Sequence, residues 1–200
     1  MIISDLPPKG QSIAESPEFL PLPLDQLSLD AVMEIQLYIK VEDRFIKYRE
    51  PGIPFDEEVR ARLKENGHSY IYYRSYEGSL LSPYLEQNLR QLLNDPHQSD
   101  TLKAGALYTT SVHLVRELIK DPTSPQAVKT CQNIVTEEVE FMLSTPQALG
   151  LIIALASRDY YTYTHSVNVS LISIMFANFL NWDDKRIKDL GVGAILHDMG

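Results

Sequence analysis

The amino-acid sequence predicts an α+β protein, with a small amino-terminal α/β module followed by an all-α bundle. Apolar and polar residues alternate over positions 34–42, which is the period of two that a half-buried strand shows. From Pro83 onward, apolar residues instead recur at helical spacing. A chain of 200 residues with 44% hydrophobic content can bury a core and is long enough for two small domains.

The amino-terminal elements follow from local residue types. Residues 1–29 are predicted to be an extended leader, because prolines lie among polar residues there. The α+β module is expected over residues 30–78, with strands at 34–41, 45–49 and 69–73. Asp56 can cap a short helix that Gly67 ends. The tyrosines of the third strand are interpreted as packing residues rather than as a ligand-stacking surface, because strands favour aromatic side chains.

The region 79–200 is predicted to be helical. Helices are expected at 84–93, at 99–120 and from about 125 to 142, and the single cysteine, Cys131, is expected to be a core residue that forms no intramolecular disulfide. A further helix begins near His165, and its predicted apolar face is Val169, Ile172 and Phe176. The next helix begins near residues 183–184 and ends at His197.

Charge and hydropathy exclude several classes of partner. The net charge of -9 argues against binding to a nucleic acid duplex, which normally requires a basic face. The polar, proline-containing start of the chain does not resemble a secretory signal. The longest apolar stretch, residues 148–156, is far shorter than the ~20 residues of a membrane-spanning helix. These patterns predict a cytoplasmic protein, and regulatory partners or a homodimer stay open.

Two of the five histidines are candidates for chemistry. Asn181, in the predicted turn, is sixteen residues from both His165 and His197. A hairpin folded there travels about 24 Å in each direction at 1.5 Å per residue, so both histidines arrive at the same end. The other histidines, for which a surface or packing role is expected, are His68, His97 and His113.

The dipeptide His197-Asp198 strengthens the candidate site. The carboxylate of Asp198 has two oxygens, so it can contact two metal ions, and a mixture of imidazole and carboxylate ligands suits Fe or Mn. Two such ions, about 3.5–4 Å apart, can activate water for attack on phosphorus. A His-Asp pair also arises by chance in about one of four sequences of this length, and a packed, hydrogen-bonded imidazole would explain it too. The mirrored position of His165 favours the metal hypothesis.

The stretches YTYTHSVNVS (residues 161–170) and GAILHDMG (residues 193–200) are similar to paired motifs of the HD superfamily of metal-dependent phosphohydrolases. Within that superfamily they resemble the HD-GYP phosphodiesterases, which open cyclic di-guanylate. The resemblance covers roughly residues 150–200 and implies an HD-type bundle. It implies that His165, His197 and Asp198 are metal ligands, that Asp198 bridges two ions, and that His197 and Asp198 act in catalysis.

Neighbouring positions of the motif refine the expected metal count. Some family members have a glutamate four residues before the first histidine and hold a third metal. Tyr161 stands at that position here, so two divalent transition metal ions, Fe or Mn, are expected. Thr162 and Ser166 also match the motif and are expected to have supporting positions around the site.

The resemblance implies a metal-dependent phosphodiesterase that hydrolyses cyclic di-guanylate, with the amino-terminal module as a regulatory unit. Two alternatives stay open: another HD-type nucleotide phosphohydrolase, and a degenerate HD domain that acts as a signalling or binding module. The family's later lysine, histidines, aspartate and GYP tripeptide are not among residues 1–200. We therefore expect residues 1–200 to be the amino-terminal part of a longer enzyme, to bind metal weakly and to show no turnover alone.

Overall fold

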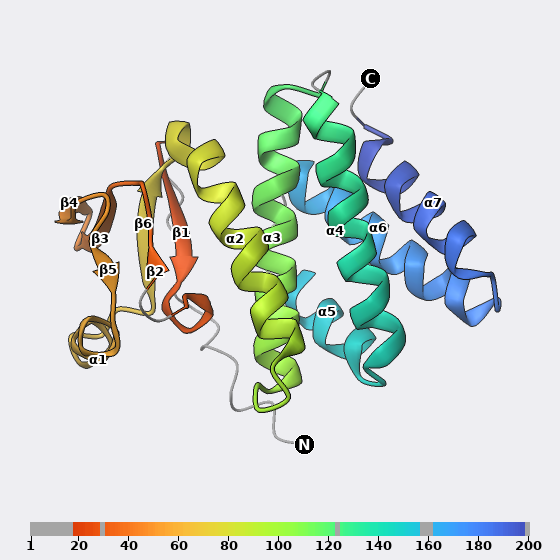
Figure 1. Cartoon of the computed structure of the whole chain (residues 1–200), viewed down its shortest axis with the longest axis horizontal. Coiled ribbons are helices and arrows are strands. Elements are labelled where there is room, and N and C mark those ends of the chain that lie inside the picture. The colour runs from red at the N-terminus through yellow and green to blue at the C-terminus, as the bar shows by residue number, and fades with distance from the viewer. Residues whose placement is uncertain (1–17, 29–30, 123–124, 157–161, 199–200) are drawn as a thin grey trace.

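A computed structural model describes residues 18–28, 31–122, 125–156 and 162–198 of the chain. A small sheet module stands at one side and a helical bundle at the other, with two long helices between them (Figure 1). The predicted α+β fold, a small module followed by helices, is confirmed.

The module contains a four-stranded antiparallel sheet. Its order is β1 (Phe19–Pro23), β6 (Tyr70–Arg74), β3 (Leu37–Val41) and β4 (Arg44–Arg49). A separate two-stranded sheet pairs β2 (Ala31–Val32) with β5 (Pro54–Phe55). Glu42 joins β3 to β4 with a φ of 54°, a conformation that tight hairpin turns require. The three strands predicted at 34–41, 45–49 and 69–73 are confirmed as β3, β4 and β6, with boundaries shifted by up to three residues.

Strand β1 corrects the predicted leader. Residues 1–17 lie outside the described residues, but 19–23 form an edge strand and η2 (Leu24–Gln26) is a short 3-10 helix. Leu20 and Leu22 are buried in the module core, whereas Pro21 and Pro23 alternate with them. Proline is tolerated on an edge strand because its missing N–H can face away from the ladder. Pro21 and Pro23 therefore belong to a strand at the edge of the sheet and not to an extended leader.

Helix α1 (Glu57–Glu65) forms as predicted. The Val59 N–H donates to Oδ1 of Asp56 over 2.8 Å, which caps the first turn. Gly67 has a φ of +81°, a conformation that glycine adopts without strain, and it follows the helix end. Val59 and Leu63 are buried against the sheet module's core.

Helix α2 (Gly78–Asn94) begins six residues before the predicted start at Tyr84. Pro83 lies inside it, although proline removes one helical hydrogen bond. Leu81 and Leu85, on either side of Pro83, are buried in the module core, and Leu89 is buried in the bundle core. Burial of these leucines compensates for the lost hydrogen bond, and α2 thereby contributes to both cores.

The bundle consists of α3 (Asp100–Lys120), α4 (Pro125–Ser144), α5 (Ala148–Ala156), α6 (Thr162–Phe179) and α7 (Asp184–Leu196). Ser99 caps α3 by accepting from Leu102 N–H. Cys131 is fully buried, as predicted, and burial raises the pKa of its thiol to about 12. None of the described helices is both long enough and apolar enough to cross a membrane.

The predicted apolar face of α6 is wrong. Ile172 and Phe176 are 52% and 61% exposed, whereas Val167, Leu171 and Ile174 are fully buried. Helix α6 is apolar on most sides, so periodicity alone does not identify the face that packs. His165 itself is half-buried, so it lies between the buried and the exposed sides of α6.

The turn between α6 and α7 closes a helical hairpin. Asn181 has a φ of 56°; its N–H donates to the Asn178 carbonyl, and Trp182 N–H donates to the Ala177 carbonyl. These two bonds form a Schellman motif, which ends a helix and reverses the chain. Asp183 then caps α7 by accepting from Arg186 N–H. The predicted turn is thus confirmed.

Close packing at Gly191 fixes α7 against α4 and α6, and it leads to a stability prediction. A Cβ atom there would lie 2.7 Å from Val135 Cγ1 and 3.2 Å from Ile174 Cδ1. Both neighbours are buried, and the β-branched Val135 cannot rotate away easily. We expect Gly191→Ala to lower the free energy of unfolding by about 1–3 kcal/mol, as overpacking does.

The matched control lies two residues further along the same helix. No atom lies within 4 Å of a Cβ built on Gly193, so Gly193→Ala is expected to raise the free energy of unfolding by roughly 0.5–1 kcal/mol. Denaturant unfolding of both variants measures the difference. Shifts of the same sign in the two variants would contradict this account of the α4–α6–α7 contact.

Candidate metal centre

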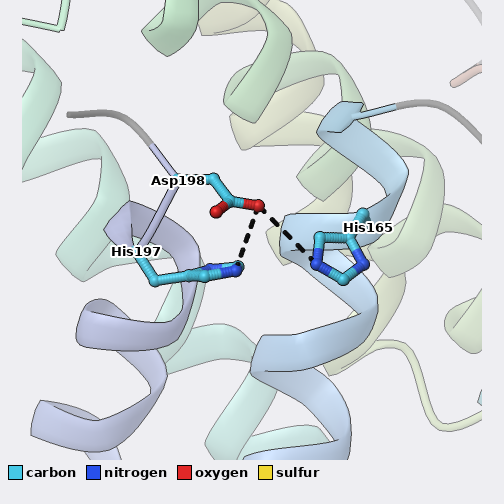
Figure 2. Close-up of side chains that lie close together, drawn as sticks. All are labelled: His165, His197 and Asp198. Atoms are coloured by element: carbon cyan, nitrogen blue, oxygen red, sulfur yellow. Dashed lines mark ion pairs between the residues drawn. The ribbon is translucent and has the colours of Figure 1, made fainter.

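The structure brings the two predicted histidines together at one end of the α6–α7 hairpin. Nε2 of His165 lies 3.7 Å from Oδ2 of Asp198, and Nε2 of His197 lies 3.1 Å from the same oxygen. The centroids of the imidazole rings are 5.4 Å apart, and one ligand atom from each residue lies within 4.8 Å of the others (Figure 2). The convergence predicted from hairpin spacing is confirmed.

Each side chain reaches the site from a helix end. His165 is the fourth residue of α6, and α7 ends at Leu196, so His197 and Asp198 lie just past its last residue. Neighbouring residues inside a helix point about 100° apart, so they rarely reach one point. At the end of α7 the side chains of His197 and Asp198 nevertheless point to a common place (Figure 2).

A backbone contact orients His197 as a ligand. Nδ1 of His197 lies 2.7 Å from the carbonyl oxygen of Ala194. A carbonyl only accepts, so Nδ1 carries the proton and Nε2 of a neutral ring presents its lone pair. That lone pair faces the Asp198 carboxylate oxygen at 3.1 Å, so a metal ion shared by the two atoms, or a second proton on the ring, would remove their repulsion. Such a hydrogen bond from the other ring nitrogen is the usual way in which proteins orient metal-binding histidines.

The donor set and its accessibility fit a divalent transition metal. Two imidazole nitrogens and a carboxylate suit Fe, Mn or Zn better than Mg or Ca, which prefer oxygen alone. The side chains of His165, His197 and Asp198 are 41%, 37% and 46% exposed, so an ion and a substrate can both reach them. The three ligands found among the described residues leave coordination positions open, to water, substrate or further ligands.

The remaining histidines do not join this group. His97 is exposed and His68 is half-buried. His113 is buried and hydrogen-bonded to the hydroxyls of Tyr73 and Ser82, and burial lowers its pKa to about 3. The packing role predicted for His113 is therefore confirmed.

The supporting motif positions are only partly visible in the structure. Ser166 is buried beside the first ligand, at 1% exposure. Tyr161, on which the expected metal count depended, lies outside the described residues, and for Thr162 only the backbone is described. The roles of these residues and the count of two ions stay predictions.

Sequence reasoning missed a buried carboxylate in the bundle. Glu138 of α4 is fully buried, and its two oxygens accept from Ser111 Oγ at 3.0 Å and Ser170 Oγ at 2.8 Å. Burial raises its pKa from 4.5 to about 7, although the two serine hydrogen bonds act in the opposite direction. The signal was present in the sequence, because Glu138 interrupts the apolar stripe of α4 next to Val139.

With an all-α bundle, a helical hairpin and a His/His/Asp group, the chain has the features of an HD-type domain. No protein-family model matches it. It is 31% identical over 99 residues to the cyclic di-GMP phosphodiesterase PA4108 of Pseudomonas aeruginosa, an alignment that covers 48% of this chain. The chain spans 24%, about a quarter, of the length of that relative.

A solved structure resembles nearly the whole chain. Bd1817, an HDG"Y"P protein from Bdellovibrio bacteriovorus, matches with a TM-score of 0.60 and 25% sequence identity over 91% of this chain and 60% of its own. The predicted resemblance to HD-GYP proteins is confirmed by both comparisons, and together they support an HD-GYP domain in this chain. The relative from Pseudomonas aeruginosa is a phosphodiesterase, and the similarity to it supports a hydrolase family.

Proposed function

We propose that this chain forms part of a metal-dependent phosphodiesterase that hydrolyses cyclic di-GMP. The observation that carries the proposal is the convergence of His165, His197 and Asp198 on one accessible point, in a chain similar to a cyclic di-GMP phosphodiesterase. Bound divalent ions would supply the positive charge that stabilises phosphoryl transfer and lowers the pKa of water. An acidic chain with a net charge of -9 has particular need of such charge to attract an anionic substrate.

Under this proposal the three residues have different parts. His165 and His197 hold the metal through Nε2, and the Ala194 carbonyl keeps the His197 ring in the productive tautomer. Asp198 is the one anionic ligand of the group, and its two oxygens allow it to contact two ions. We propose two divalent ions, Fe or Mn, as the metal complement.

The experiment compares binding and turnover of cyclic di-GMP by residues 1–200 with and without Mn²⁺. We expect binding that needs Mn²⁺, that EDTA reverses, and that His197→Ala loses, together with no detectable hydrolysis by chromatography. Hydrolysis is expected to be absent because three protein ligands cannot fill the coordination of two ions. Robust hydrolysis of cyclic di-GMP by residues 1–200 would contradict the expectation that these residues alone are inactive.

The same titration separates the alternatives. Stronger metal-dependent binding of nucleoside phosphates than of cyclic di-GMP would favour another HD-type phosphohydrolase. Binding of cyclic di-GMP that is unaffected by EDTA and by His197→Ala would instead favour a binding module without metal chemistry.

A further inference from the structure

The position of His165 depends on the first turn of α6. His165 is only the fourth residue of that helix, and terminal turns open more easily than helix interiors. Metal coordination tolerates displacements of only a few tenths of an ångström in a ligand atom. Contacts that hold the first turn of α6 therefore bear directly on the candidate metal centre.

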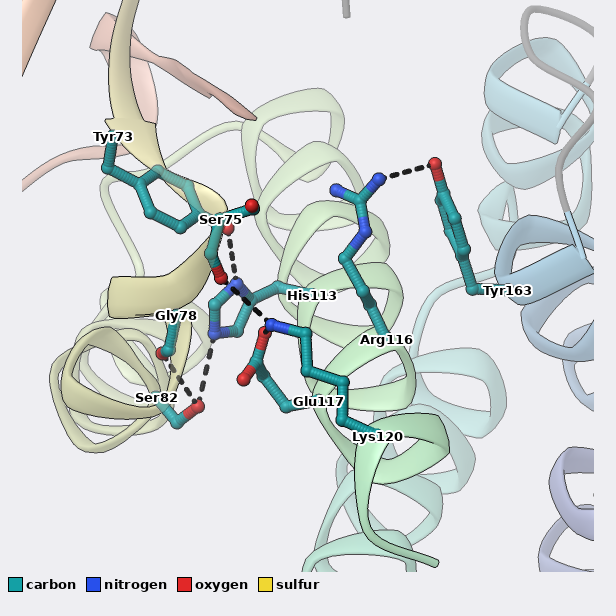
Figure 3. Close-up of polar contacts among 9 residues, drawn as sticks. All are labelled: Tyr73, Ser75, Gly78, Ser82, His113, Arg116, Glu117, Lys120 and Tyr163. Atoms are coloured by element: carbon teal, nitrogen blue, oxygen red, sulfur yellow. Dashed lines mark hydrogen bonds and ion pairs between the residues drawn. The ribbon is translucent and has the colours of Figure 1, made fainter. Parts of the chain in front are cut away.

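Arg116 of α3 makes such a contact with Tyr163, two residues before His165. Its Nη2 donates to the Tyr163 hydroxyl over 2.7 Å, and its Cζ lies 4.3 Å from the centroid of the same ring (Figure 3). One guanidinium thus holds the tyrosine both by a hydrogen bond and by a cation–π contact. Both groups are half-buried, which strengthens the electrostatic part.

A second contact from α3 lies on the other side of His165. The Tyr108 hydroxyl donates to Asn168 Oδ1 over 3.0 Å, three residues after His165. Helix α3 therefore contacts α6 both before and after the candidate ligand. The Arg116 contact is the one on the terminal turn, where an unsupported helix would open first.

The turn of α3 that carries Arg116 is itself anchored to the amino-terminal module. His113, one turn earlier, lies 2.7 Å from the Tyr73 hydroxyl and 3.1 Å from Ser82 Oγ. Lys120, one turn later, donates to the Ser75 carbonyl over 2.8 Å (Figure 3). Arg116 therefore reaches α6 from a stretch of α3 whose backbone is held by contacts one turn before it and one turn after it.

We propose that Arg116 is a positioning residue, which holds Tyr163 and thereby keeps His165 at the distance from His197 and Asp198 that metal binding requires. The inference rests on the proposed function for its metal readout. Its structural part, the fixing of the first turn of α6, stands independently of any metal.

Arg116→Met tests the proposal because it keeps the apolar stem and removes the guanidinium. We expect faster backbone hydrogen exchange in residues 163–168 without metal, and Mn²⁺ affinity weakened about tenfold, the lower end for loss of a ligand-orienting contact. Electrostatics alone predicts a higher Mn²⁺ affinity for Arg116→Met, since removal of a positive charge lowers the repulsion of the cation. Arg116→Lys, which keeps the charge but not the planar fork, is expected to weaken binding as well.

Arg90→Met is the matched control. Arg90 forms an ion pair with Glu137, with 3.1 Å between Nε and Oε1, and this pair does not involve Arg116 or Tyr163. Loss of the Arg90 guanidinium is therefore expected to leave both the hydrogen exchange and the Mn²⁺ affinity unchanged. Unchanged exchange in residues 163–168 of Arg116→Met, or faster exchange with unchanged or tighter Mn²⁺ binding, would overturn the proposal. If wild type and His165→Ala bind Mn²⁺ equally, the proposed function fails, and the exchange measurement alone decides whether Arg116 fixes the turn.

Discussion

Replacement of any of the three clustered side chains is expected to weaken Mn²⁺ binding by at least about a hundredfold, because even loss of a group that only orients a ligand costs 10–100-fold. The substitutions are His165→Ala, His197→Ala and Asp198→Asn. Each removes one donor from a set whose atoms lie within 4.8 Å of one another, and Asp198→Asn also removes the negative charge. Isothermal titration with Mn²⁺, under reducing conditions, measures the loss.

Two substitutions control for the change of residue type. His97→Ala removes an exposed histidine, and Asp189→Asn removes an exposed carboxylate from α7. Neither residue belongs to the cluster, so both variants are expected to bind Mn²⁺ as wild type does. Equal losses in the controls and in the cluster variants would show that binding depends on overall charge rather than on this site.

The second large effect concerns stability and pH. The pKa of Glu138 is raised from 4.5 to about 7 in the folded chain, since burial disfavours its charged form. The folded state therefore keeps a proton that the unfolded state loses. The resulting contribution to stability is fully present below pH 4.5 and is lost as the pH rises through about 7. Its size is on the order of 3 kcal/mol for a shift of this extent.

Glu138→Gln is expected to remove this dependence, because the amide is neutral at every pH. Its carbonyl oxygen can accept from one of the Ser111 and Ser170 hydroxyls, and its NH2 group can donate to the other. The free energy of unfolding of the variant, relative to wild type, should rise between pH 5 and pH 8. Glu140→Gln is the control, since Glu140 lies on the same helix but its side chain is 66% exposed. Parallel pH curves for wild type and Glu138→Gln would contradict the assigned burial effect.

Local sequence signals predicted most helix and strand positions and the hairpin that builds the site. Asp56, Asp183 and Asn181 have the conformations and contacts that their residue types favour at helix ends. The equal spacing of His165 and His197 from Asn181 predicted their meeting, because rise per residue is a local property of helices.

The errors arose where tertiary packing decides the outcome. Which face of α6 is buried depends on its packing against other helices, including α3 and α4. The sequence of a helix that is apolar on most sides does not indicate which face that will be. Prolines on β1 are tolerated only because that strand lies at the edge of the sheet. The partners of Glu138 and Arg116 come from other helices, so no spacing rule within one segment reveals them.

The central claim is that His165, His197 and Asp198 share a metal ion. The most direct test is a crystal structure of the chain soaked in Mn²⁺, with the ion located by anomalous scattering. The account predicts a peak about 2 Å from Nε2 of both histidines and from a carboxylate oxygen of Asp198, which is the usual length of such bonds. A peak bound elsewhere, or a site that stays without density at millimolar Mn²⁺ while the imidazoles keep their positions, would contradict it.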